Sequence, residues 1–340
     1  MTARAAVKDI ASYLPKGELT NEALARELGD WDAAKIYEKT GILSRRIAAA
    51  NECSSDLAVG AAQALFARGA CAPEDIDYLL LCTQSPDYFL PTTACLVQNR
   101  LRLKTSCGAI DFNQGCSGFV YGLSLAKSLV ESGIARNVLL ITAETYSKFI
   151  NPRDRSVRTL FGDAAAATLV AAVDESDELI GPFVFGTDGR GADNLIVRAG
   201  GLRQPISEEA TIEREDKGGN WRSDANLFMN GAEIFNFTLT AVPKAIETLL
   251  QCSGGGIDDV DYFVFHQANR FMLDRLRNKL AIAQEKFCLE MESCGNTVSS
   301  TIPIALERAK ADGRVHKGDK VMVVGFGVGY SWAAAMMRVM

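Results

Sequence analysis

The stretch DIDYLLLCTQ, residues 75–84, decides the fold because the chain contains a second version of it. Residues 259–268 read DVDYFVFHQA, with two aspartates and a tyrosine at the same spacing and an apolar run behind them. The similarity continues in the same order, since NVLLITAE at 137–144 is matched by KVMVVGFG at 320–327. Matches that recur in one order predict a duplicated structural unit.

Each half alternates short apolar runs with amphipathic stretches, which is typical of βαβ units around a mostly parallel sheet. Residues 117–132 carry apolar or small side chains at helical spacing, and Gly133 is placed to end that helix. We therefore predict an α/β fold with two halves, residues 1–174 and 175–340. The polar segment 203–224 has no periodicity, so it is either a surface insertion or flap, or an ordinary solvated loop.

Composition limits the possible function classes. The 340 residues are 48% hydrophobic and 23% charged, as in a soluble globular protein, and the net charge of −6 argues against nucleic-acid binding. Nine cysteines, without a CxxC pair, indicate free thiols in a reducing compartment. The N-terminus lacks the apolar segment of a secretory signal, and the small, apolar run at 164–173 is about half as long as a membrane span. We expect a cytoplasmic protein that does not insert into membranes.

One cysteine stands out, Cys116 in DFNQGCSGFVYG at 111–122, because it lies between Gly115 and Gly118 where an apolar run ends and a helix begins. A helix N-terminus favours the thiolate form of a nucleophile. The two glycines would leave room for an incoming acyl group, and the turn could direct N–H groups at an oxyanion. The alternative is a buried, inert cysteine, which is the usual fate of this residue type.

Only two histidines are present. His316 lies in a polar turn, whereas His266 ends the apolar strand YFVF, at the sheet edge where α/β proteins bind ligands. The repeat places Asn296 of SCGNTVSST opposite Cys116, at the start of the matching helix, although Asn is also a common helix N-cap. Two neutral donors of this kind could together stabilise an enolate.

With these elements in place, the sequence resembles the β-ketoacyl-acyl-carrier-protein synthase III family of the thiolase superfamily, nearly from end to end. The resemblance rests on GCSGF at 115–119, FGD at 161–163, FHQAN at 265–269, GNT at 295–297 and GFGVGYSW at 325–332. It implies a thiolase-like, five-layered α-β-α-β-α fold with two halves related by a pseudo-twofold axis. The first half would carry the nucleophilic cysteine, and the second half the histidine and asparagine.

The resemblance also implies a two-stage reaction without a tightly bound cofactor or metal. Cys116 would take an acyl group from acyl-CoA. His266 and Asn296 would then bind malonyl-acyl-carrier protein, or malonyl-CoA, and stabilise the enolate left by decarboxylation, which attacks the acyl group to give a β-ketoacyl thioester. The backbone N–H groups of Cys116 and Val328 would form the oxyanion hole, although the family usually has glycine in place of Val328.

Further site residues are implied by the same resemblance. The coenzyme A contacts would be Lys39, Arg155, Gly231 and Asn269. Arg155 would stack on the adenine, while the tryptophan that usually completes this clamp is replaced by a lysine at position 35, with Trp31 nearby.

The resemblance also implies two protein contacts. Leu90 would reach from a second subunit to close an acyl pocket that includes Phe161, so a homodimer is expected. An acidic carrier protein would dock on the basic helix after the strand-end histidine, although this helix could equally be an ordinary solvated face. Its basic residues are Arg270, Arg275, Arg277 and Lys279.

Several rival functions share part of this pattern. Elongating ketoacyl synthases use a second histidine, thiolases a second cysteine in the last glycine loop, and hydroxymethylglutaryl-CoA synthases a glutamate where this chain has Gln84. An acyltransferase of the same fold could move the acyl group to a hydroxyl or amine without decarboxylation. A cysteine hydrolase and a non-catalytic partner subunit are further alternatives. Retention of Cys116 argues against the partner subunit, and the histidine–asparagine pair favours condensation.

Overall fold

The computed structural model describes residues 3–29 and 31–340, and its first half is built on a five-stranded sheet. The strands lie in the order β1-β7-β6-β4-β5, with β4 parallel to both of its neighbours and β7 antiparallel to both of its own. Their bounds are β1 (Arg4–Tyr13), β4 (Tyr78–Cys82), β5 (Gly108–Phe112), β6 (Asn137–Glu144) and β7 (Ala164–Val173). β4, β6 and β7 are almost continuously apolar because both faces of this sheet are covered.

The second half repeats this arrangement. A four-stranded sheet has the order β13-β14-β15-β8, with β13 parallel to β14 and the other pairs antiparallel. Beyond β13, a parallel bridge from Phe263 to Phe287 occupies the place that β5 has in the first sheet. The bounds are β8 (Ile180–Thr187), β13 (Tyr262–Phe265), β14 (Lys320–Gly327) and β15 (Ser331–Arg338). The duplication predicted from the sequence is therefore confirmed.

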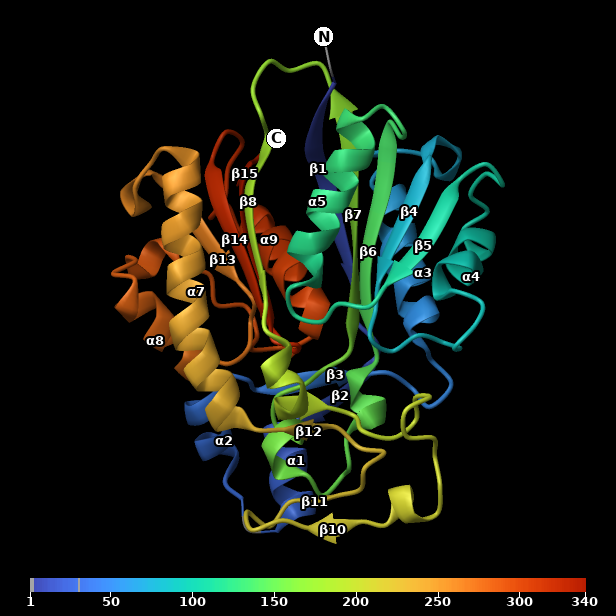
Figure 1. Cartoon of the computed structure of the whole chain (residues 1–340), viewed down its shortest axis with the longest axis vertical. Helices are drawn as coiled ribbons and strands as arrows, with labels where there is room; N and C mark the ends of the chain where they lie inside the picture. Colours follow the sequence, from blue (N-terminus) through green and yellow to red (C-terminus); the bar gives the residue numbers. More distant parts are fainter. Residues whose placement is uncertain (1–2, 30) are drawn as a thin grey trace.

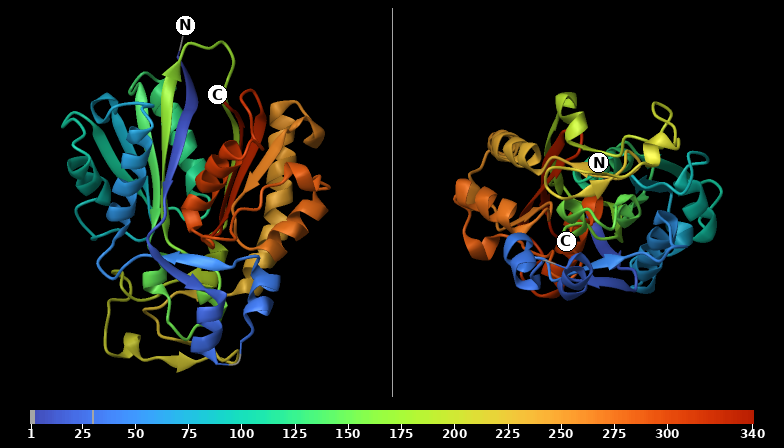
Figure 2. Two further views of the ribbon diagram at one scale, coloured as in Figure 1. Left: turned by 180° about the vertical axis from the view of Figure 1, so that it is seen from behind. Right: turned by 90° about the horizontal axis from the view of Figure 1, so that it is seen from below.

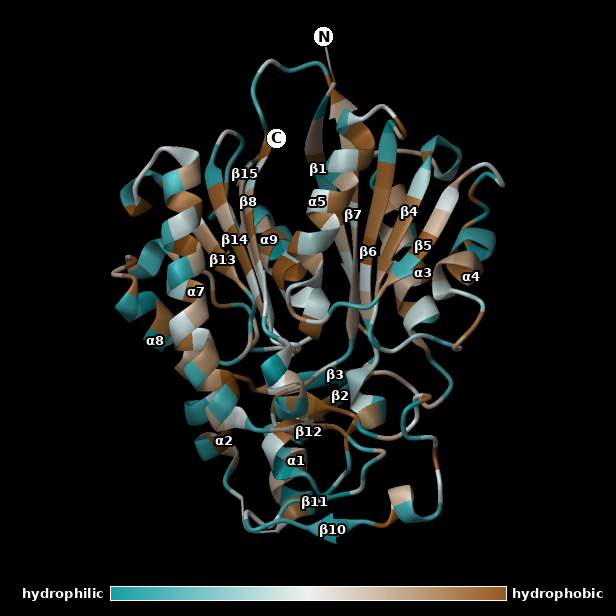
Figure 3. Cartoon of the chain, viewed as in Figure 1, coloured by the Kyte–Doolittle hydropathy of each residue, from teal (hydrophilic) through white to brown (hydrophobic). Residues whose placement is uncertain are grey.

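Helices complete five layers, which confirms the predicted thiolase-like fold (Figures 1 and 2). Helices α5 and α9 pack between the sheets, α3 and α4 cover the outer face of the first sheet, and α7 and α8 cover the second. The strands are mainly hydrophobic, and teal residues gather on the outer helices (Figure 3). The bounds are α3 (Ser54–Ala67), α4 (Thr93–Arg100), α5 (Gly118–Glu131), α7 (Gly231–Ser253), α8 (Arg270–Lys279) and α9 (Thr301–Ala311).

The two central helices begin at equivalent places. α5 starts two residues after Cys116, and Gly133 follows it with a left-handed φ of 77°, as predicted. Before α9, a 3-10 turn (η7, Val298–Ser300) starts two residues after Asn296. Asn296 therefore lies ahead of η7 and is not the N-cap of α9. The division of the chain at residues 174 and 175 lies in the connection between β7 and β8 and stays a prediction.

Short elements gather at one end of the sheets, at the bottom of Figure 1. They comprise β2 (Gly17–Thr20), β3 (Ser44–Ile47), α1 (Asn21–Leu28), α2 (Ala33–Thr40), α6 (Arg155–Arg158), β9 (Leu195–Ile196), β10 (Arg214–Glu215), β11 (Trp221–Arg222) and β12 (Phe228–Met229). Within the two described ranges, none of the helices is long and apolar enough to cross a bilayer.

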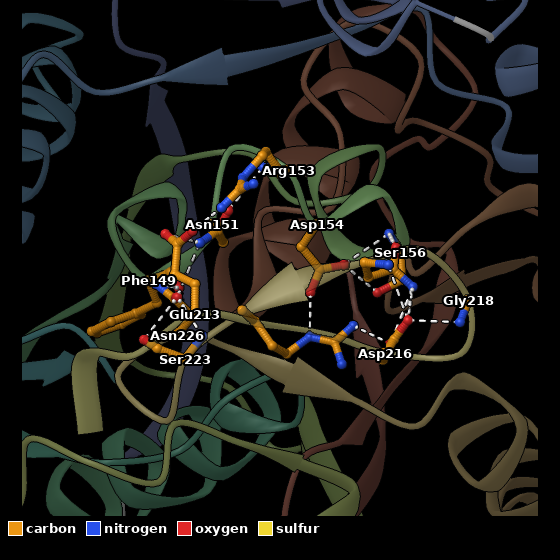
Figure 4. A network of polar contacts seen from close by, with 12 residues as sticks. Phe149, Asn151, Arg153, Asp154, Ser156, Glu213, Asp216, Gly218, Ser223 and Asn226 are labelled. Atoms are coloured by element: carbon orange, nitrogen blue, oxygen red, sulfur yellow. Dashed lines mark hydrogen bonds and ion pairs between the residues drawn. The ribbon is translucent and has the colours of Figure 1, made fainter. Parts of the chain in front are cut away.

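The segment 203–224 is largely exposed, as expected of a surface insertion, but it contains the hairpin β10–β11 and is anchored to the protein. Arg222 pairs with the fully buried Asp154 at 2.7 Å and with Asp216 at 2.8 Å. Figure 4 shows this polar network, which joins the segment to the chain around residues 149–156. A buried ion pair distinguishes this segment from an ordinary solvated loop.

Candidate active site

A cavity of about 80 Å³ brings together the three residues predicted to be catalytic. Cys116, His266 and Asn296 all line it, although they come from distant parts of the chain. A larger cavity, about 700 Å³, lies beside β2, and among the described residues it shares Phe161 with this one. The smaller cavity is therefore the candidate active site, because the thiol of Cys116, the imidazole of His266 and the carboxamide of Asn296 line it.

Cys116 is buried, with 4% of its surface exposed. Burial raises the pKa of its thiol to about 12, and the nearby Glu144 carboxylate adds to this effect. The backbone N–H groups of Val328 and of Cys116 itself are directed at the sulfur and lower the pKa, but they do not offset the burial. The prediction that the helix N-terminus favours a thiolate is therefore wrong for the resting protein, in which Cys116 is a neutral thiol.

The glycines around Cys116 do not have the role expected from the sequence. A Cβ on Gly118 would lie 2.3 Å from the sulfur of Cys82, and a Cβ on Gly115 would lie 2.4 Å from Cγ1 of Val328. These two glycines accommodate protein atoms and do not make room for an acyl group. The glycine that keeps a side chain away from the nucleophile is Gly327, where a Cβ would lie 2.8 Å from Sγ of Cys116.

His266 follows β13 directly and is held by two hydrogen bonds. Its backbone N–H donates to Val324 at 2.8 Å, and its Nδ1 lies 2.8 Å from the hydroxyl of Thr301. Burial lowers the pKa of the imidazole to about 3, so the ring is neutral at physiological pH. The Thr301 hydroxyl has one proton and two acceptors within reach, Nδ1 of His266 and the carbonyl of Val298 at 3.0 Å. In the tautomer in which this hydroxyl donates to Nδ1, the ring proton lies on Nε2 and His266 is a neutral donor.

Asn296 is fixed through both its backbone and its side chain. Its N–H donates to the carbonyl of Leu160 at 2.8 Å, and its carbonyl accepts from Gly162 at 3.0 Å. Its side-chain Oδ1 accepts from the N–H of Val298 at 2.9 Å. Because Oδ1 is occupied in this way, the carboxamide offers its Nδ2 group as a donor to a ligand. The start of the η7–α9 segment thus orients both Asn296 and His266.

Glu144 was not predicted from the sequence. It ends β6, is fully buried, and accepts hydrogen bonds from the N–H of Gln84 at 3.1 Å and from the hydroxyls of Ser85 and Ser299 at 3.2 and 2.8 Å. Burial raises its pKa to about 8, so it is mostly protonated at neutral pH. Its hydrogen bond with Ser299 links β6 of the first sheet to the η7 turn. The sequence signal for it is an acidic residue at the end of an apolar strand.

The residues predicted to bind coenzyme A fall into two groups. Gly231 and Asn269 line the cavity, at the N-terminal ends of α7 and α8. Lys39 is exposed in the last turn of α2, and Arg155 begins α6, so neither lines the cavity. The guanidinium of Arg155 lies 5.8 Å from the ring centroid of Trp31. An aromatic partner for Arg155 therefore comes from Trp31, four residues before the lysine that replaces the usual tryptophan.

The two predicted acyl-pocket residues differ in position. Phe161 lines the cavity and is only 3% exposed. Leu90 is 82% exposed and does not line the cavity of its own chain. It follows Tyr88 and Phe89, which are 62% and 80% exposed, so three consecutive large apolar side chains face outward. Exposed apolar patches such as this apolar loop, residues 88–90, are typical of interaction surfaces.

The basic side chains of α8 are only partly available for docking. Arg270 lies over the ring of Tyr37 at 5.1 Å and donates to its hydroxyl at 3.3 Å. Arg277 donates to a backbone carbonyl beyond the end of the helix. Lys279 is exposed, although it donates to a carbonyl of α7 at 2.7 Å, and Arg275 is exposed beside an aromatic ring. Arg275 and Lys279 are therefore the best placed for an acidic partner.

Comparisons with known proteins identify the family. The model described as "3-Oxoacyl-[acyl-carrier-protein (ACP)] synthase III" matches residues 110–189, and the corresponding C-terminal model matches residues 250–339. A beta-ketoacyl-[acyl-carrier-protein] synthase III from Caldanaerobacter subterraneus subsp. tengcongensis is 37% identical over 334 residues, covering 98% of this chain and 97% of the relative.

Solved structures agree with this result. A 3-oxoacyl-(acyl-carrier-protein) synthase III crystal structure is 57% identical, with a TM-score of 0.98 over 98% of this chain and 99% of the other. The 3-oxoacyl-(acyl-carrier protein) synthase from Burkholderia xenovorans LB400 is 36% identical, with a TM-score of 0.91 over 99% and 95% of the two chains. The chain therefore belongs to the β-ketoacyl-acyl-carrier-protein synthase III family and is an acyltransferase, a condensing enzyme with the thiolase-like fold.

Proposed function

We propose that Cys116 accepts the acyl group and that His266 and Asn296 promote the decarboxylative condensation. The observation that carries this assignment is that the three side chains line one cavity. Acyl-CoA enters as a substrate and not as a resident cofactor. Malonyl-acyl-carrier protein is the proposed second substrate, and malonyl-CoA is the alternative donor.

The first stage is transfer of the acyl group to the sulfur. The Cys116 thiol attacks the thioester carbonyl, and coenzyme A leaves as its thiol after the cysteine proton has been transferred to it. Because the pKa of Cys116 is raised to about 12, the proton must leave as the new C–S bond forms. The N–H groups of Cys116 and Val328, which both lie close to the sulfur, would stabilise the oxyanion that forms on the attacked carbonyl.

The second stage forms the carbon–carbon bond. The thioester carbonyl of the malonyl group accepts hydrogen bonds from Nε2 of His266 and Nδ2 of Asn296. Carbon dioxide leaves, and these donors hold the enolate, which attacks the acyl group on Cys116 and releases the sulfur. A neutral imidazole, with a pKa of about 3, suits a donor that must stay uncharged. Transfer to a hydroxyl or amine would not need this donor pair.

The substrate arms approach from the α7 and α8 side of the cavity. Gly231 and Asn269 are the proposed contacts of the pantetheine arm. Arg155 with Trp31 would hold the adenine, and Lys39 a phosphate. Carrier protein would dock on α8 through the exposed Arg275 and Lys279; Arg270 and Arg277 would contribute charge at the edge of this surface.

A homodimer and a cytoplasmic location complete the proposal. The apolar loop 88–90 would cross to a second copy, where Leu90 would close the acyl pocket. β5 is an edge strand of the first sheet with Ile110 40% exposed, which also suits an interface. All nine cysteines, each within the described residues, are free, which supports a reducing compartment.

Stage-specific variants test the assignment. Cys116→Ala should abolish the mass increment that appears after treatment with acyl-CoA, whereas Cys95→Ala, which removes an exposed thiol on α4, should retain it. His266→Ala and Asn296→Ala should keep the increment but lose release of labelled carbon dioxide from malonyl-acyl-carrier protein. Intact-protein mass spectrometry and trapping of carbon dioxide measure the two stages. Acyl transfer by the wild type without carbon dioxide release would contradict the proposal.

A further inference from the structure

A second cavity, of about 230 Å³, adjoins the site of acylation. It shares Leu195 with the catalytic cavity, and Val328 of the proposed oxyanion hole also lines it. Leu195 therefore lies between the two cavities, and an acyl chain on Cys116 that passes this side chain would enter the second one. We call the second cavity the tail cavity. Six of the nine described residues that line it are apolar, and Gln84, Asn113 and Tyr146 add polar groups that a plain alkyl chain would not use.

Three uncharged polar side chains form one connected row in the wall of the tail cavity. The hydroxyl of Tyr146 donates to Oε1 of Gln84 at 2.6 Å, and Nε2 of Gln84 donates to Oδ1 of Asn113 at 3.1 Å. The ring of Tyr146 is buried against Phe161 and Phe149, with centroid distances of 5.3 and 5.9 Å. This packing holds the Tyr146 end of the row in place, whereas Asn113 at the other end is exposed.

The row also lies close to the nucleophile. A Cβ on Gly115 would come within 2.6 Å of Oε1 of Gln84, and Gly115 is the residue before Cys116. Adjacent Cα atoms are about 3.8 Å apart, so the carboxamide lies close to the backbone that carries the nucleophile. The backbone N–H of Gln84 donates to Glu144 at 3.1 Å, which fixes the start of this side chain.

Hydrogen-bonding capacity remains after these contacts are counted. Gln84 keeps a second N–H on Nε2, the carboxamide of Asn113 has two N–H groups besides its occupied oxygen, and the oxygen of Tyr146 can still accept. A ligand hydroxyl can satisfy both kinds of group. The wall of the tail cavity, as far as the described residues form it, contains no charged side chain, so a carboxylate would lack a counter-charge there.

We propose that the primer is a short hydroxyacyl group whose uncharged hydroxyl binds the row Gln84–Tyr146–Asn113. This inference rests on the proposed function, in which Cys116 carries the primer. A plain acyl chain would instead place methylene groups against the polar row. One hydrogen bond of this kind corresponds to a preference of about tenfold for the hydroxylated chain.

The test compares rates of acyl-enzyme formation with 3-hydroxybutyryl-CoA, as both enantiomers, and butyryl-CoA, followed by intact-protein mass. The wild type should load one 3-hydroxybutyryl enantiomer about tenfold faster than butyryl. Gln84→Leu should remove this preference while still accepting butyryl, and Tyr146→Phe, which retains the ring, should weaken it. Ile196→Val changes an apolar wall residue of the same cavity and should leave the ratio of the two rates unaltered.

The rates of loading decide whether the primer carries a hydroxyl group. Equal or faster loading of butyryl by the wild type would overturn it, and so would a preference that survives in both polar variants. In either case Cys116 would still be acylated, so the proposed function would stand. Absence of any mass increment with either CoA ester, and with acetyl- to octanoyl-CoA, would overturn the proposed function and this inference with it.

Discussion

Each of the three proposed catalytic residues is held by a neighbour that takes no part in the proposed reaction. Val328 directs its N–H at Cys116, the N–H of Val298 holds the side chain of Asn296, and the hydroxyl of Thr301 holds Nδ1 of His266. Burial then determines the charge states, since it keeps the thiol protonated and the imidazole neutral. The chemistry at this site consequently depends on hydrogen bonds more than on ionised groups.

Thr301 offers a test of this control. Thr301→Val removes the hydroxyl that contacts Nδ1 of His266 and the carbonyl of Val298, so the proposed tautomer with its proton on Nε2 loses its partner at Nδ1. We expect carbon dioxide release from malonyl-acyl-carrier protein to fall about tenfold while acylation of Cys116 continues at its normal rate. Thr301→Ser should restore decarboxylation because it keeps the hydroxyl. Loss of both stages to the same extent would instead indicate a packing role.

Glu144 predicts a dependence of stability on pH. Its pKa is raised from 4.5 to about 8, so the native protein retains a proton that the unfolded chain releases. The stabilising contribution of this proton to the free energy of unfolding is fully present below pH 4.5. It decreases by up to about 1.4 kcal/mol per pH unit and is lost as the pH rises through about 8.

Urea unfolding at pH 6 and pH 8 measures this effect. The unfolding midpoint of the wild type should fall over this interval by more than that of Glu144→Gln, which stays neutral. Glu175→Gln, at an exposed position, should behave like the wild type. Equal pH dependence in wild type and Glu144→Gln would show that Glu144 is ionised throughout.

At the scale of elements, the anchored hairpin β10–β11 depends on one buried ion pair. Asp154 is fully buried, caps the N-terminus of α6 through the N–H of Ser156, and pairs with Arg222. α6 begins with Arg155, the proposed adenine contact, so the hairpin supports the loop that would hold coenzyme A.

Arg222→Leu should leave the Asp154 carboxylate buried without its partner, at a cost of about 3 kcal/mol. We expect faster tryptic cleavage within residues 203–224 and a higher KM for acyl-CoA, while kcat changes little. Arg198→Leu is the matched control because the Arg198–Asp193 pair is largely exposed, and surface pairs contribute little. Unchanged proteolysis of the Arg222 variant would show that other contacts hold the segment.

At the scale of the whole molecule, the apolar loop 88–90 carries the proposed dimer. Phe89→Ser combined with Leu90→Ser should convert a dimer into a species of about the chain mass, 36.7 kDa, in light scattering. Acylation should also slow, because the acyl pocket would lose its closing residue. Leu202→Ser, at a 96% exposed position outside this loop, should remain dimeric. A wild-type monomer, or a dimeric double variant, would contradict the proposed assembly.

Sequence alone predicted the features that depend on local pattern. The repeat of DIDYLLLCTQ in DVDYFVFHQA gave the duplicated α/β organisation, because apolar periodicity and strand length are local properties. The motifs around Cys116, His266 and Asn296 also identified three residues that share a cavity. The helix 117–132 was predicted to within one residue at each end, because Gly133 terminates it.

The tertiary structure decided what depends on atoms from separate segments. It reversed the expected pKa direction of Cys116, reassigned the space beside the sulfur to Gly327, and placed Glu144 near enough to affect the pKa of Cys116. It also packed Arg270 against α2, where its charge is less available to a partner. Spacing along the chain contains no measure of burial, and burial sets the energy of a charge more strongly than the nearest helix end does. Charge state and shape at the site were therefore fixed only when the two halves packed together.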